Sequence, residues 1–263
     1  EKDMRRILII IAIFSVTILS FSKQCDRKVA LQMYKTVKVL DLSGKVINYL
    51  DESGAELAFV ARKRAEKNHG IDYTHIGIAW KQDGKWTVTN LLEECIDPKK
   101  AALYDDGVAI FYGSAKVYDA LILIPSEKTQ REFKEVVINK EIDEIFDEKY
   151  SINTNVWKDE YQNCVQFVLE AYGYYKSGEK YTTRKEVISW LKENDFQPEK
   201  VKVNWFERTL GPLILPNINM DDHKDREKSN IIEVASPRKV VEFIKKLEPE
   251  STIYEIKDEN STK

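Results

Sequence analysis

The sequence predicts an α+β fold, because strand-like segments dominate the first half of the chain and helix-like segments the second. Residues 57–61, 73–80, 86–92 and 118–124 are short apolar runs, several rich in β-branched and aromatic residues, and these are expected to form strands. Strands and helices do not alternate in the way that builds a parallel sheet, so the sheet is expected to be antiparallel.

Turn and capping residues give the boundaries of these elements. Asp83-Gly84 separates two of the strand-like runs and predicts a hairpin. Helices are expected over residues 28–53, 127–139, 161–174, 184–191 and 237–246, several of which begin after a capping Ser or Thr. Residues 196–230 contain several prolines and are expected to be strand and loop. We expect a single domain over residues 23–263 with a helical C-terminal extension.

The N-terminal segment resembles an export signal. Arg5 and Arg6 precede an apolar run over residues 7–21, and small residues follow at Ser20 and Ser22. We expect either a signal cleaved after Ser22 or an N-terminal membrane anchor, and in both cases a periplasmic or extracellular domain. The run is a little short for a membrane span of about 20 residues.

The overall charge indicates no nucleic-acid partner. The formal net charge is -3, and acidic and basic residues are interspersed, whereas a nucleic-acid-binding protein carries a basic face or stripe. The membrane is expected to be contacted only through the N-terminal segment, if that segment is retained.

Export changes what the cysteines are expected to do. The chain has three, Cys25, Cys95 and Cys164. In an oxidising compartment two can pair, which leaves an odd one. Cys25 and Cys95 are both expected at the ends of elements. We therefore expect them to form a disulfide and Cys164 to remain a thiol.

Cys164 lies at the predicted first turn of a helix, within Tyr161-Gln162-Asn163-Cys164. Unpaired backbone N–H groups and the helix dipole at such a position lower the pKa of a thiol, and they can also hold an oxyanion. The alternative is that Cys164 is a small buried core residue.

His75 is the residue expected to serve this thiol as a base. It lies in the strand-like run Tyr73-Thr74-His75-Ile76-Gly77, where Gly77 permits a close approach on the same face of the strand. A cysteine nucleophile needs a nearby group that accepts its proton and returns it to the leaving group. The alternative is a histidine buried in the core.

The His-x-Gly strand, followed by Asn-Cys-x-x-Phe-Val, resembles the circularly permuted branch of the papain-like superfamily, which includes NlpC-type hydrolases and lecithin:retinol acyltransferase-like proteins. More closely, the chain resembles an exported bacterial family, domain-of-unknown-function family 2145. The features that carry this resemblance are Cys25-Asp26, Tyr73-Thr74-His75-Ile76-Gly77, Asn90-Leu91-Leu92 with Cys95, Tyr161-Gln162-Asn163-Cys164 and Asp221-Asp222-His223.

The superfamily resemblance implies a permuted papain-like core, with an antiparallel sheet packed against a helix that carries the cysteine. It implies Cys164 as the nucleophile and His75 as the base. The residue that orients the imidazole would come from the next strand, where Thr87, Thr89 and Asn90 are polar; Asn90 is our choice, because a carboxamide accepts from an imidazole N–H.

Other polar residues have less specific expectations. Tyr161 or Gln162 is expected to donate to an oxyanion or to line the cleft, and the alternative for each is a structural role. Asp221-Asp222-His223 is expected to be a polar loop or a cleft wall, since adjacent residues rarely converge on one metal ion. We expect no metal and no cofactor.

Together these observations predict a cysteine hydrolase or acyltransferase. Cys164 would attack an amide, ester or thioester and form an acyl-enzyme, with an envelope peptide or a lipid as substrate. The alternative is a non-catalytic exported binding or scaffold module on the same fold, because the strand after His75 lacks the His or Glu that is common in relatives.

Overall fold

The computed structural model describes residues 33–63, 70–226 and 230–258. The predicted signal segment and Cys25 lie outside this range. The described helices are α2 (Met33–Glu52), α3 (Val108–Tyr112), α4 (Glu127–Ile138), α5 (Cys164–Ser177), α6 (Arg184–Glu193), α7 (Trp205–Ile214) and α8 (Pro237–Leu247), with short 3-10 turns η1 (Glu141–Ile145), η2 (Gly178–Lys180) and η3 (Asp221–Arg226). The strands are β1 (Leu57–Lys63), β2 (His75–Gln82), β3 (Lys85–Glu93), β4 (Ala101–Gly107), β5 (Val117–Ile124), β6 (Glu199–Lys202), β7 (Ile231–Val234) and β8 (Thr252–Ile256).

Six strands form one antiparallel sheet in the order β4-β3-β2-β1-β5-β8. The β2–β3 turn is the predicted hairpin: Asp83 and Gly84 both have positive φ, at 50° and 72°, as a two-residue type I′ turn requires. This turn fixes the register in which Ile78 faces Thr89. The α+β class and the antiparallel sheet are confirmed.

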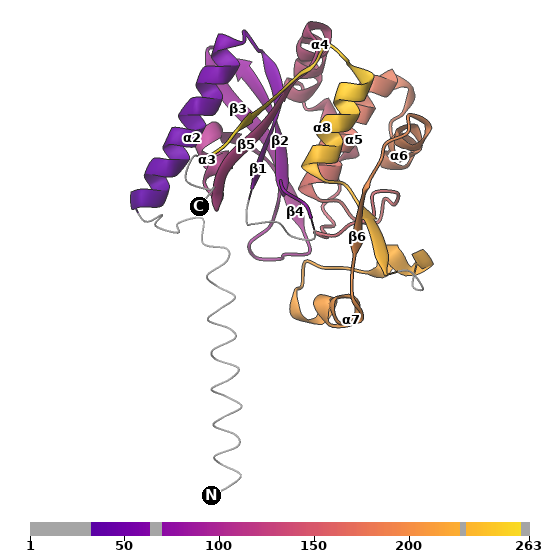
Figure 1. The fold of residues 1–263 in the computed structure, drawn as a ribbon. Coiled ribbons are helices and arrows are strands. Elements are labelled where there is room, and N and C mark those ends of the chain that lie inside the picture. The colour runs from indigo at the N-terminus through magenta and orange to yellow at the C-terminus, as the bar shows by residue number, and fades with distance from the viewer. Residues whose placement is uncertain (1–32, 64–69, 227–229, 259–263) are drawn as a thin grey trace, which may run out of the picture.

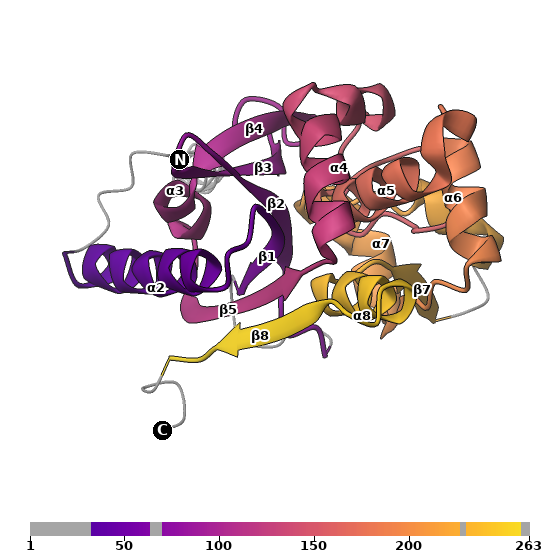
Figure 2. The ribbon, with the colours of Figure 1, turned by 90° about the horizontal axis from the view of Figure 1, so that it is seen from above.

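Helices cover both faces of this sheet (Figure 2). α2 and α3 lie on one face, over a core that includes Val60, Val88 and Phe111. α4, α5 and α8 lie on the other face, over a core that includes Phe59, Ile78 and Phe167. The alternation of side chains along each strand therefore divides the interior into two cores.

The C-terminal part of the chain returns to the main sheet. After α8, the strand β8 pairs with β5 at the edge of the sheet, so the predicted helical extension also contributes a strand. β6 and β7 form a separate two-stranded sheet. α7, which follows β6, was not predicted; it lies at the lower end of the molecule in Figure 1.

Most predicted helices agree with the structure. α4, α6 and α8 begin at the predicted capping residues Ser126, Thr183 and Ser236. α5 begins three residues later than predicted, directly after Asn163. Within the described part of the chain, no helix combines the length and apolar character needed to cross a membrane.

Candidate functional site

Three of the predicted site residues lie at the same end of the central sheet. His75 is the first residue of β2, Asn90 lies near the end of β3, and Cys164 is the first residue of α5. Because β2 and β3 are antiparallel neighbours, β2 starts at the same end of the sheet where β3 finishes. α5 packs against both strands. The three residues thus come from three neighbouring segments at this end of the sheet.

Asn90 holds the His75 ring by a hydrogen bond. Nε2 of His75 lies 3.0 Å from Oδ1 of Asn90. The Asn90 Nδ2 group donates to the Asp106 carboxylate and to the Tyr104 carbonyl, both at 3.2 Å. Those two acceptors fix the orientation of the amide, because they can only receive N–H donors. Oδ1 therefore accepts from Nε2–H, and Nδ1 is the basic nitrogen of the neutral ring.

The other two polar residues on β3 are placed differently. Thr89 accepts from Nε1 of Trp80 at 2.9 Å and donates to Asp105 at 2.6 Å. Thr87 is paired with Trp80 in the strand ladder, five residues beyond His75. Asn90 is the one of the three predicted candidates that the structure brings to the imidazole.

The Cys164 thiol lies against the backbone on either side of His75. Asn163 caps α5 by accepting from the N–H groups of Val165 at 3.0 Å and Gln166 at 2.9 Å, so Cys164 is the first helical residue. Its Sγ is 4.0 Å from the carbonyl oxygen of Thr74. The backbone N–H of Ile76 also acts on the sulfur and lowers its pKa.

Burial decides the ionisation of this thiol. The Cys164 side chain is only 7% exposed. Burial raises its pKa to about 11, although the Arg62 charge and nearby backbone N–H groups lower it. The prediction of a lowered pKa is wrong, because desolvation outweighs the helix N-terminus. At neutral pH the resting group is a thiol, and it needs a base to lose its proton.

His75 and α5 lie on opposite faces of the sheet. The His75 ring contacts Phe111 of α3, with ring centroids 5.4 Å apart, whereas its neighbour Ile76 packs in the core beneath α5. A Cβ on Gly77 would lie 2.6 Å from Val88 Cγ1 and 3.1 Å from Phe111. The close approach predicted at Gly77 is therefore made by these side chains, and Cys164 approaches from the start of β2.

Arg62 is a buried cation beside His75 that the sequence analysis missed. The two residues are Cα partners in the β1–β2 ladder, and Arg62 is 6% exposed. Its guanidinium lies over the Phe111 ring at 5.3 Å and donates to Ser114. The pairing of β1 with β5 shifts register directly after Arg62, and such irregularities re-aim side chains. An arginine inside an otherwise apolar strand was the available signal.

Gln162 belongs to a buried polar network. Its side-chain oxygen accepts from the Asp147 N–H at 3.0 Å, and its nitrogen donates to Glu170 at 2.6 Å. Arg184 donates to the same Glu170 at 2.8 Å and to the Tyr161 carbonyl at 2.8 Å. Both ends of the Gln162 amide are committed to this network, which ties the segment before α5 to α5 and α6. It supports the position of Cys164 and does not supply a donor for an oxyanion.

Asp222 and His223 lie in the interior, and their neighbour Asp221 is exposed. Asp222 accepts from the Asn155 N–H at 2.6 Å, and His223 Nε2 lies 2.7 Å from the Asn153 carbonyl oxygen. Burial raises the pKa of Asp222, while His223 lowers it. These contacts hold two loops together. No group of three or more metal-type side chains occurs within the residues that the structure describes.

The predicted Cys25–Cys95 disulfide falls partly outside the described residues. Cys95 is exposed and lies two residues after β3, but Cys25 precedes the first described residue, so the pairing stays a prediction. Cys164 is buried as a thiol and is not joined to Cys95.

Comparison with known proteins identifies the family. A family model matches residues 49–244 and so includes all three site residues. The chain belongs to the family described as "Uncharacterized protein conserved in bacteria (DUF2145)". No curated protein matches the chain. Among solved structures, the metalloprotein YiiX from Escherichia coli O157:H7 aligns over 78% of this chain and 97% of its own, with 13% identity and a TM-score of 0.41. A likeness at that level carries no conclusion about the site.

Proposed function

We propose that this DUF2145 protein is a thiol-dependent hydrolase or acyltransferase. Cys164 is the nucleophile, His75 is the base and Asn90 orients the imidazole. The observation that carries this proposal is the His75–Asn90 hydrogen bond at 3.0 Å, at the strand start where the Cys164 sulfur lies. It holds Nε2 as a donor, and Nδ1 is then the nitrogen suited to accept the thiol proton.

The reaction follows from these roles. As the Cys164 sulfur bonds to the carbonyl carbon of an amide, ester or thioester, its proton passes to Nδ1 of His75. The carbonyl π electrons move to oxygen. When the tetrahedral intermediate collapses, the bond to the leaving group breaks and His75 returns the proton to that group. Water or another acceptor, deprotonated by His75, then attacks the Cys164 thioester and restores the thiol.

Negative charge that develops on the sulfur or on the substrate oxygen would be stabilised by positively polarised groups at this site. Backbone N–H groups of Ile76 and Cys164 act on the sulfur and lower its pKa. We assign these two groups to the oxyanion, because donors that are already oriented stabilise a transition state without reorganising. Arg62 adds a positive charge that also lowers the pKa of the thiol.

We extend the proposal to the core as a whole, which we interpret as a permuted papain-like arrangement. The support is the chain order, in which the histidine strand β2 precedes the cysteine helix α5, and the packing of α5 against β2 and β3. We also propose that the domain works outside the cytoplasm, with Cys25 and Cys95 paired. Peptide mapping without reductant should recover these two cysteines in one linked fragment; a Cys164-containing disulfide would contradict this.

A non-catalytic scaffold is the competing function, favoured by one observation. Burial raises the Cys164 pKa to about 11, as is typical of a structural cysteine. Catalytic turnover is expected of a hydrolase or acyltransferase and is not expected of a scaffold, so a turnover assay distinguishes the two functions.

The test is hydrolysis of a chromogenic 4-nitrophenyl thioester. The native protein should release thiol catalytically. Cys164→Ala should lose at least about 1000-fold in kcat/KM, whereas Cys95→Ser serves as the matched control and keeps activity once reductant is present for both. Turnover that survives in Cys164→Ala, or is absent from the native protein across ester, thioester and amide substrates, would reject the proposal.

A further inference from the structure

A cavity of about 470 Å³ lies beside the start of α5. This volume falls in the range that holds small-molecule ligands. Tyr161, three residues before Cys164, lines it, and three residues of chain span at most about 10 Å. The Tyr161 hydroxyl accepts from Asn219 at 2.6 Å, which joins the wall formed by the α5 entry to the wall formed by the loop after α7.

The cavity is at the same sheet end as the proposed dyad. A further part of its lining comes from a short ladder in which the Tyr150 N–H donates to the Lys99 carbonyl at 2.7 Å and the Ala101 N–H donates to the Glu148 carbonyl at 2.8 Å. Ala101 begins β4 and is paired with Glu93 at the end of β3. The ladder thus continues the edge of the sheet at which β2 begins.

The lining combines basic and apolar side chains. Lys99 and Lys149 both line the cavity, and neither ammonium group has a hydrogen-bond or ion-pair partner among the described residues. The lining also includes the apolar side chains of Pro212, Ile218 and Met220. Asp221 supplies one carboxylate to the lining, so the pair of lysines leaves a net positive charge.

We propose that this cavity is the acyl-binding subsite of the enzyme and that it selects acyl groups with a distal carboxylate. The carboxylate would lie between Lys99 and Lys149, and the methylene chain would pack against Pro212 and Ile218 on its way to Cys164. This assignment rests on the proposed thiol hydrolase function and names its substrate class.

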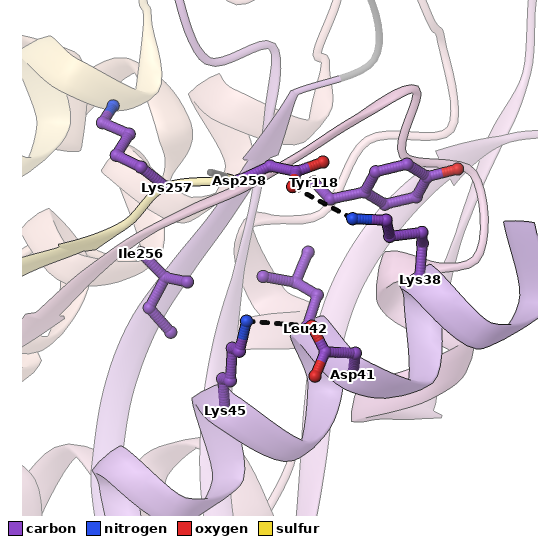
Figure 3. A pocket seen from close by; sticks show the side chains of 8 residues that line it. All are labelled: Lys38, Asp41, Leu42, Lys45, Tyr118, Ile256, Lys257 and Asp258. Atoms are coloured by element: carbon purple, nitrogen blue, oxygen red, sulfur yellow. Dashed lines mark hydrogen bonds and ion pairs between the residues drawn. The ribbon is translucent and has the colours of Figure 1, made fainter. Parts of the chain in front are cut away.

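A second surface hollow, among the described residues, lacks these features. It lies between α2 and the end of β8 and has a volume of only about 10 Å³. Its charges are already paired, Lys38 with Asp258 at 3.1 Å and Lys45 with Asp41 at 2.9 Å (Figure 3). Paired charges and so little space leave no room for an organic ligand.

Binding without turnover tests the subsite directly. Adipanilate, which bears a carboxylate, and its neutral counterpart hexananilide are titrated calorimetrically into Cys164→Ala protein. We expect Lys99→Gln/Lys149→Gln to weaken adipanilate binding about tenfold, with hexananilide changed by less than about twofold. Lys200→Gln/Lys202→Gln on β6 is the matched control and should change neither. Equal effects on both ligands, or no effect of the cavity variant, would overturn the subsite.

Turnover with a second matched pair separates this inference from the proposed function. Adipoyl and hexanoyl 4-nitrophenyl thioesters differ in the distal carboxylate, and the native protein should prefer the adipoyl compound about tenfold in kcat/KM, a preference that the lysine variant removes. Turnover without that preference overturns the substrate class and leaves the thiol chemistry standing. Lysine-dependent binding of adipanilate with no turnover of either thioester overturns the proposed function and leaves an anion-selective cavity.

Discussion

The two partners of the proposed dyad are held in different ways. His75 is oriented by directed hydrogen bonds that run from its Nε2 to Asn90 and from Asn90 to Asp106. Cys164 is placed by burial and helix packing, with a weak 4.0 Å contact from Sγ to a carbonyl. In the proposed reaction, the imidazole that acts as the base is therefore already oriented, whereas the charge on the Cys164 sulfur must be created as the reaction proceeds. This difference predicts that the positions of the His75 imidazole and of the Cys164 thiol are sensitive to substitutions at different residues.

The largest effect is expected where packing positions the thiol. Arg184→Ala removes the cation from the fully buried Glu170, and breaking a buried pair costs about 3–5 kcal/mol. Urea denaturation followed by circular dichroism measures the loss. Lys185→Ala, an exposed neighbour on the same helix, should stay within about 0.5 kcal/mol. An Arg184→Ala loss below about 1 kcal/mol would show that the network does not hold α5.

A smaller effect is expected where hydrogen bonds orient the base. Asn90→Ala should lower kcat about 100-fold with little change in KM, because the imidazole loses the acceptor that holds its Nε2–H. Thr87→Ala on the same strand is the control and should retain more than about half of the activity. Equal losses in the two variants would contradict the assignment of Asn90.

The smallest effect concerns the charge near the thiol. Alkylation of Cys164 by iodoacetamide should accelerate about tenfold per pH unit between pH 7 and 10, because the thiolate fraction grows in this way below a pKa of about 11. Arg62→Met should slow alkylation at pH 8.5 about three- to tenfold, since the charge that lowers the thiol pKa is lost. Lys63→Met is the neighbouring control. A rate plateau below pH 9, or equal rates in both variants, would contradict burial and the role of Arg62.

Local sequence signals predicted the pairing of β2 and β3, the strands that carry His75 and Asn90. The Asp83-Gly84 turn fixes the pairing of β2 with β3, and this pairing brings His75 and Asn90 to one end and one face of the sheet. The start of α5 was predicted three residues too early, at Tyr161, although Asn163 caps the helix at Cys164 and was the local signal for the observed start. These features depend on neighbouring residues and on strand periodicity, so they could be predicted from the sequence.

Features that depend on tertiary packing could not be predicted in this way. The pKa of the Cys164 thiol depends on how deeply tertiary packing buries the side chain. No local sequence pattern encodes that burial. The network around Glu170 had a signal in Gln162, Gln166 and Glu170, spaced by four residues in an otherwise apolar segment, but its partner Arg184 comes from another helix. α7 was missed because Pro212 suggested a loop, although Asn204 and Glu207 form a capping box.

The central claim is that His75 takes the proton of Cys164. The most direct measurement is rapid quench of the protein with a hexanoyl thioester, followed by mass spectrometry of the Cys164 peptide. We expect an acyl group on Cys164 in the native protein and formation at least about 100-fold slower in His75→Ala, with the fold of the variant retained as judged by circular dichroism. Acylation of Cys164 at the same rate in both proteins, or no acyl group on Cys164 in the native protein, would contradict it.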